Sequence, residues 1–122
     1  MKRLHSASMS IMVFCAVMLG VAVVAHAADA EQGKKLYGQF CVSCHGQSGK
    51  GDGPAAAALN PKPRDHTDKE LMGKMSDDDM LKVIKNGGAS IGKSPLMPPW
   101  GGAMKDEQIQ DVIAYIRTLC CQ

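Results

Sequence analysis

The sequence predicts a small all-α domain, and three observations support this fold class. Three segments carry apolar residues at helical spacing, no stretch alternates apolar and polar residues as a strand does, and two Gly/Pro-rich connectors separate the helical segments. We expect helices over residues 29–40, 76–86 and 106–119, with the connectors over 46–63 and 87–104. Two long connectors in so short a chain suggest that they wrap around something.

The first helix has a start signal and one unusual interior residue. Asp29 with Gln32 fits a capping box, and an apolar face ends in Tyr37 and Phe40. Gly33 inside this helix costs about 1 kcal/mol relative to Ala. Such a glycine either permits close contact with another helix or is simply tolerated.

The other two helices have clear apolar stripes. Ser76 is a good N-cap, acidic residues 77–79 suit the first turn of the second helix, and Gly87-Gly88 ends it. The third helix should begin at Asp106 with a weaker cap. The stripes expected to be buried are Met80, Val83 and Ile84 in the second helix, and Ile109, Val112, Ile113 and Ile116 in the third.

The N-terminus is typical of a secretory signal peptide. Lys2-Arg3 gives a positive start, residues 9–25 are uncharged and almost wholly apolar, and Ala25-His26-Ala27 fits a signal peptidase site. Cleavage after Ala27 would leave a single domain over residues 28–122 and place it in the periplasm. An uncleaved anchor would hold the domain on the membrane instead, and a lipid-anchored Cys15 is a weaker alternative.

The sequence Cys41-Val42-Ser43-Cys44-His45 is a C-x-x-C-H motif, the pattern of covalent haem attachment. On a helical turn, residues i and i+3 share a face, so both sulfurs reach the two vinyl groups on one haem edge. The next residue, His45, then directs a ring nitrogen at the iron. We therefore expect one haem c, held by Cys41 and Cys44, with His45 as an iron ligand.

Three other readings of the two cysteines compete with haem attachment. A zinc site would need four ligands, and the remaining cysteines after residue 27, Cys120 and Cys121, are adjacent, which makes poor tetrahedral geometry. A thioredoxin-like pair would lie in a βαβ unit, which the pattern lacks. A structural disulfide between Cys41 and Cys44 is possible in an exported protein.

The iron needs a sixth ligand, and Met97 is the best candidate. Pro95, Pro98 and Pro99 stiffen its loop, because each fixes its own φ and restricts the residue before it. A thioether is a weak ligand that benefits from a loop of low entropy. The alternatives after residue 27 are His66, Met72, Met75, Met80 and Met104.

Composition agrees with a bound cofactor and excludes two partner classes. A domain of this size is only marginally stable without a disulfide, a metal or an oligomer partner. Residues 28–122 hold only one Trp, two Tyr and one Phe, so we expect a haem to fill the core. Of the 14 basic residues, Lys2 and Arg3 lie in the signal, which leaves a near balance with 12 acidic ones. That balance argues against nucleic acid and against strong attraction to anionic lipid.

The chain after residue 27 resembles a class I bacterial c-type cytochrome over essentially its whole length. The resemblance rests on Gly33-x-x-x-Tyr37, residues 41–45, Gly46, Gly51-Asp52-Gly53-Pro54, Met97-Pro98 and Tyr115-Ile116-Arg117-x-Leu119. It implies a small helical fold with one haem in a crevice, His and Met axial ligands, and crossing first and last helices. Lys105, where a serine cap is expected, and the terminal Cys120-Cys121-Gln122 depart from the family pattern.

These features predict a one-electron carrier and not an enzyme. Two protein ligands would fill both axial sites, and no second catalytic constellation stands out. Transient donor and acceptor proteins would dock at the haem edge, where Lys50, Lys62, Arg64 and Lys93 either assist or form a solvated surface. A haem-bearing subunit of a larger oxidoreductase, and a sensor or peroxidase with a labile Met97, remain as alternatives.

The adjacent Cys120 and Cys121 suggest a second, covalent partner. A bridge between neighbouring residues closes a strained ring, and Cys41 and Cys44 would be occupied by haem. Exposed thiols in an oxidising compartment tend to pair between chains. We therefore expect a disulfide-linked dimer in part of the protein.

Overall fold

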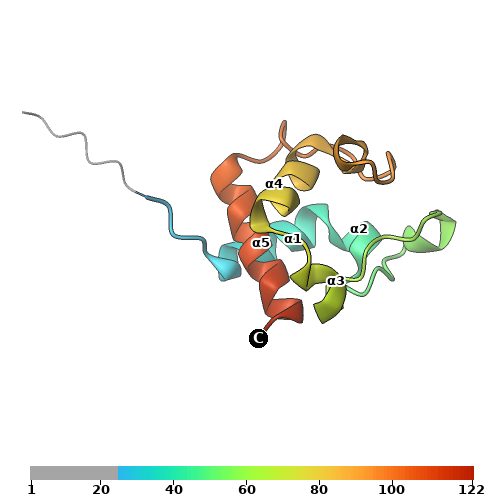
Figure 1. Ribbon diagram of the computed structural model, residues 1–122, viewed down its shortest axis with the longest axis horizontal. Helices are drawn as coiled ribbons and strands as arrows, with labels where there is room; N and C mark the ends of the chain where they lie inside the picture. Colours follow the sequence, from blue (N-terminus) through green and yellow to red (C-terminus); the bar gives the residue numbers. More distant parts are fainter. Residues whose placement is uncertain (1–24) are drawn as a thin grey trace, which may run out of the picture.

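The computed structural model describes residues 25–122, which fold into helices joined by loops with no strand among them (Figure 1). The expected all-α class is confirmed. Nearly all of the predicted signal peptide, including Cys15, lies outside the described residues. No helix within 25–122 is long and apolar enough to cross a membrane. The helices are α1 (Ala30–Phe40), α2 (Val42–His45), α3 (Lys69–Gly73), α4 (Asp77–Asn86) and α5 (Asp106–Cys120), with short 3-10 turns η1 (Ala56–Ala58) and η2 (Gly88–Ile91).

The three long helices begin where their capping residues predict. The Asp29 carboxylate accepts the backbone N–H groups of residues 31 and 32, which is one half of the expected capping box. Ser76 and Asp79 form a full reciprocal box at α4. At α5, Lys105 offers no side-chain cap, and the Gln108 side chain instead accepts the Lys105 N–H at 3.0 Å. Each device satisfies backbone donors that a helix start leaves unpaired.

Helices α1 and α5 cross in direct backbone contact (Figure 1). The crossing point is Gly33, where an added Cβ would overlap the carbonyl oxygen of Asp111. The buried Asp111 carboxylate also ties the two helices together, since its Oδ1 accepts from the Asp29 N–H at 2.8 Å and lies 2.8 Å from Nε2 of His26. The close-contact explanation of Gly33 is therefore confirmed.

The core lies where α4 packs beside this crossing pair. Both expected apolar stripes are buried, with Ile109 and Val112 of α5 fully enclosed. Met72 of α3 and Met104 of the second connector complete the same cluster. Cys41, before α2, and Met97 of the second connector pack against its edge, so the haem motif and the Met97 loop are supported by one core.

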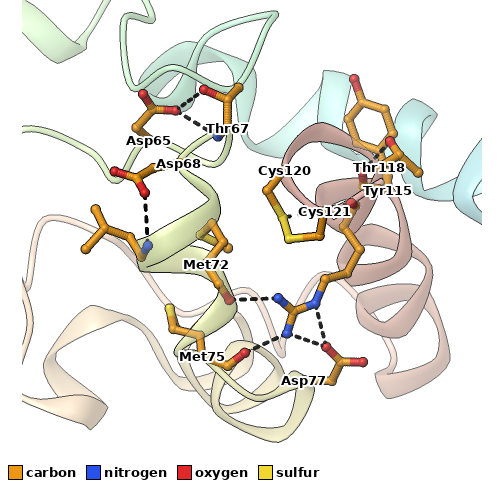
Figure 2. Close-up of a disulfide and its surroundings, with 12 residues drawn as sticks. Asp65, Thr67, Asp68, Met72, Met75, Asp77, Tyr115, Thr118, Cys120 and Cys121 are labelled. Atoms are coloured by element: carbon orange, nitrogen blue, oxygen red, sulfur yellow. Dashed lines mark hydrogen bonds and ion pairs between the residues drawn. A yellow bond between two sulfur atoms is a disulfide. The ribbon is translucent and has the colours of Figure 1, made fainter.

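Arg117 near the end of α5 binds the corner between α3 and α4, where Met72, Met75 and Asp77 lie close together (Figure 2). Its guanidinium donates to the backbone carbonyls of Met72 at 2.8 Å and Met75 at 2.6 Å, and also to the Asp77 carboxylate at 2.8 Å. The fork geometry of arginine suits this use, because several N–H donors leave one plane in fixed directions. One side chain therefore bonds to two carbonyls of the α3–α4 corner and to the first residue of α4.

Cys120 and Cys121 are bonded to each other (Figure 2). This corrects the expectation that they bridge between chains, which assumed exposed free thiols. Cys120 is only 2% exposed and belongs to the hydrophobic core, so a second chain has no access to it. Because Cys120 is buried, its sulfur bonds to the sulfur of the adjacent Cys121.

Gly33→Ala should destabilise the folded protein by roughly 2–4 kcal/mol, because the new methyl group meets backbone that cannot move without separating α1 from α5. Gly38→Ala is the matched control, since its Cβ meets nothing within 4 Å and helix propensity favours Ala by up to about 1 kcal/mol. Denaturant unfolding followed by circular dichroism measures both. Equal effects of the two substitutions would contradict the crossing contact.

The haem-loaded protein should show no alkylation of Cys120 or Cys121 by iodoacetamide in denaturant, and two added groups after reduction, because the two sulfurs pair within one chain. Mass spectrometry of the C-terminal peptide gives the count. A dimer band on a non-reducing gel that disappears with reductant would instead support the intermolecular bridge.

Candidate functional site

Helix α2 places the motif cysteines within one helical turn, as the spacing predicts. Cys41 is the N-cap, Cys44 lies inside the helix, and both are part-buried free thiols, not a disulfide. Burial, with a smaller contribution from Cys44, raises the pKa of the Cys41 thiol to about 12. The two sulfurs are therefore available as a pair at one edge of the core.

The first connector folds back to cap α2. Gly51 N–H donates to the His45 carbonyl at 2.8 Å and Gly53 N–H to the Cys44 carbonyl at 3.1 Å, so two carbonyls at the helix end are satisfied. A Cβ at Gly53 would overlap the Ser43 carbonyl, and Gly46 has a φ of 80°. The Gly51-Asp52-Gly53-Pro54 motif is thus explained by close backbone contact.

His45 is held with one ring nitrogen occupied and the other available. Its ring is 9% exposed, and Nδ1 donates to the Arg64 carbonyl at 3.0 Å, which assigns the proton to Nδ1 and leaves the Nε2 lone pair free. Burial lowers the pKa of His45, so the ring is neutral at neutral pH. A neutral imidazole whose other nitrogen donates to a carbonyl is the usual form of a metal-binding histidine.

His66 lies against His45, an arrangement that sequence reasoning did not find. The two rings stack with centroids 4.2 Å apart and planes 14° from parallel, and Nδ1 of His66 bonds to the Tyr37 hydroxyl at 3.1 Å. Burial lowers the pKa of His66 to about 3, so it is neutral. The two rings meet face to face, so their nitrogens do not point at each other across a space that an iron bound to His45 would occupy. The geometry therefore disfavours His66 as the sixth ligand.

The Met97 loop is anchored to the end of α4. Trp100 N–H and Gly101 N–H donate, each at 2.9 Å, to the Ile84 and Lys85 carbonyls of α4. Gly88 N–H donates to the Met97 carbonyl at 3.0 Å, which holds the loop on its other side. Met97 itself is part-buried against the core. The loop is thus fixed by backbone bonds in addition to its prolines.

A cavity of about 300 Å³ opens between α3, α4 and η2. Leu71, Met75 and Ile91 supply apolar walls, and Arg64, Lys74 and Lys93 lie at the polar part of its lining. Arg64 joins this cavity to His45, because its carbonyl holds the His45 ring. The Asp79 carboxylate also lines this cavity, so its charged side chains are of both signs, and none of Cys41, Cys44 and His45 is part of the lining. Lys50 and Lys62, also expected near the haem, line a separate hollow of about 320 Å³ with Gly51–Gly53.

Residues 28–116 match the family model described as "Cytochrome C oxidase, cbb3-type, subunit III". The chain belongs to this cytochrome c family. The resemblance seen in the sequence is confirmed, and with it the class I fold. One covalently bound haem c is the cofactor and electron transfer is the function. The pair of thiols and the free His45 nitrogen are a donor set that fits this group.

Named relatives of this cytochrome fall into two groups. Cytochrome c6 of Nostoc sp. (strain PCC 7120) is 32% identical over 85% of this chain and 89% of its own length, and cytochrome c-554(547) of Halothiobacillus neapolitanus is 33% identical over 76% and 99%. The cbb3-type cytochrome c oxidase subunit FixP of Bradyrhizobium sp. (strain ORS 278) is 31% identical over 75% of this chain, which spans only 28% of FixP.

Solved structures show the same fold. The KustC0563 c-type cytochrome matches with a TM-score of 0.58 at 26% identity, over 72% of this chain and 96% of that one. A chain of the Kuenenia stuttgartiensis reducing HAO-like protein complex Kustc0457/Kustc0458 matches with a TM-score of 0.61 at 26% identity, over 79% of this chain and 44% of that one.

Proposed function

We propose that this cytochrome is an exported carrier that passes one electron at a time between transient protein partners in the periplasm. Cys41 and Cys44 hold the haem by thioether bonds, and His45 and Met97 bind its iron. The haem supplies a one-electron Fe(III)/Fe(II) couple. The domain over residues 28–122 is the working protein after cleavage of the signal.

The observation that carries the proposal is the fixed state of His45. A hydrogen bond to a backbone carbonyl sets the tautomer, and His45 directly follows Cys44 on α2, the helix that begins after Cys41. Anchoring of the Met97 loop by three backbone bonds supports the second ligand, since a weak thioether is retained best on a loop with little freedom.

A carrier is favoured over an enzyme because His45 and Met97 would occupy both axial positions, which leaves no place for a substrate on the iron. Within residues 25–122, no group of three or more His, Cys, Asp or Glu side chains could hold another metal ion. The protein would then only need to bind a redox partner protein and release it. Docking for electron transfer uses small, transient interfaces.

A free carrier is favoured over a subunit of a larger oxidoreductase by the relatives. Cytochromes c6 and c-554(547) are matched over 89% and 99% of their lengths, whereas the FixP oxidase subunit is matched over a quarter of its length. The subunit remains the second candidate, because that oxidase relative contains a related domain.

The purified haem-loaded protein should cycle reversibly with one electron and turn over no substrate alone. Electron exchange with periplasmic donors and acceptors should depend weakly on salt, because basic and acidic residues after Ala27 nearly balance and long-range steering needs net charge. Spectroelectrochemistry and stopped-flow mixing at several ionic strengths measure both. Ready carbon monoxide binding to the reduced protein would favour the sensor or peroxidase reading, and migration with a larger complex in gel filtration of a native extract would favour the subunit.

Met97→Leu should open the iron to carbon monoxide and lower the reduction potential by on the order of 0.1 V or more, since axial ligands move haem potentials over about 0.8 V. Leucine keeps the volume and removes only the sulfur ligand. Met80→Leu, in the core on α4, is the matched control and should change neither property. If Met97→Leu leaves the spectrum and potential as they were, another group is the sixth ligand.

A further inference from the structure

We propose that His66 is a positioning residue that sets the ring plane of His45, and that Tyr37 holds His66 for this task. The proposal rests on the proposed role of His45 as iron ligand. It assigns a use to a buried histidine to which the proposed function gives no role.

The hydrogen bond from His45 to the Arg64 carbonyl leaves the ring plane under-determined. Carbonyl oxygens accept over a broad range of directions, so a ring anchored at Nδ1 alone still tilts about that bond. A flat partner at 4.2 Å and nearly parallel removes this freedom, because rotation of either ring out of plane makes the two faces collide. The carbonyl and the stacked ring together fix both the position and the plane of His45.

His66 is itself held from three directions. Its backbone N–H donates to the Gly49 carbonyl at 2.6 Å, its Nδ1 bonds to the Tyr37 hydroxyl, and the Tyr37 ring meets it edge-on at 5.8 Å. The side chain is 8% exposed, so water does not compete for these contacts. A histidine with these restraints presents a rigid, flat ring face to His45.

Glycine at position 49 makes the arrangement possible. Its φ is 79°, and an added Cβ would lie 3.3 Å from Cβ of His66 and 2.7 Å from Cδ1 of Leu119 in α5. The first connector, at Gly49, therefore lies between Leu119 of α5 and His66, whose ring stacks on His45. Tyr37 is fully buried and its ring packs on Tyr115 of α5, so the α1–α5 pair holds the residue that bonds to His66.

The plane of an axial imidazole matters because it selects which iron d orbital overlaps with the ring. Ring orientation therefore affects the spin distribution over the haem and its electron affinity, and partners that orient a ligand ring tune a metal site. A residue acting in this way changes spectroscopic anisotropy while it leaves the ligand identities unchanged.

The test compares haem-loaded variants by the g-values of the oxidised protein in electron paramagnetic resonance and by its haem-methyl proton shifts. His66→Leu and His66→Gln both remove the flat ring and should shift the g-values and redistribute the methyl shifts. His66→Phe keeps a flat ring and should stay near the wild type. Tyr37→Phe removes only the hydroxyl and should move the signals part of the way, while Tyr115→Phe, the matched control, should not.

Two results would overturn the proposal. One is wild-type signals in folded His66→Leu or His66→Gln protein, and the other is a His66→Phe change as large as theirs. If the ring-less variants do not load haem, equality of Tyr37→Phe and Tyr115→Phe rejects it. The proposed function fails separately, when the His45 ring protons of the wild-type protein show no hyperfine shift, because His45 is then not an iron ligand.

Discussion

The carbonyl oxygen of Asp111 lies against the bare Cα of Gly33, and this backbone contact between α1 and α5 determines the position of everything else. Because no side chain separates the helices there, Tyr37 one turn later is enclosed by α5 instead of facing solvent. Helix α2 follows α1 after a single residue, so the orientation of α1 at the crossing also sets the position of α2. A glycine that weakens its own helix is thus the residue on which the position of the haem-binding turn depends.

The site is built by two connectors that cannot fold alone. The first connector caps α2 with the N–H groups of Gly51 and Gly53. The second connector donates two N–H groups to the carbonyls of Ile84 and Lys85 near the end of α4. Both use backbone groups that helix ends leave unpaired, so the loops and the helix termini complete each other. Short-range bonds of this kind give a rigid frame to a chain with few aromatic side chains.

Local patterns predicted the long helices, their stripes and the haem motif, because helical periodicity and the C-x-x-C-H spacing act within a few residues. Helix α3 was missed, since five residues are too few to show a period. The His66–His45 stack joins residues 21 apart and the Arg64 contact uses a carbonyl that every residue has, so neither has a sequence signature. The pairing of Cys120 was misjudged because burial depends on the tertiary fold.

The bond between Cys120 and Cys121 also bears on how the protein matures. The four cysteines after residue 27 can pair in three ways, and two of these would tie α2 to the end of α5 and consume the thiols that haem attachment needs. In the structure Cys120 is bonded to Cys121, and Cys41 and Cys44 are free thiols. That bond keeps the two C-terminal cysteines from pairing with the haem motif, and among residues 25–122 it leaves Cys41 and Cys44 as the thiols open to haem attachment.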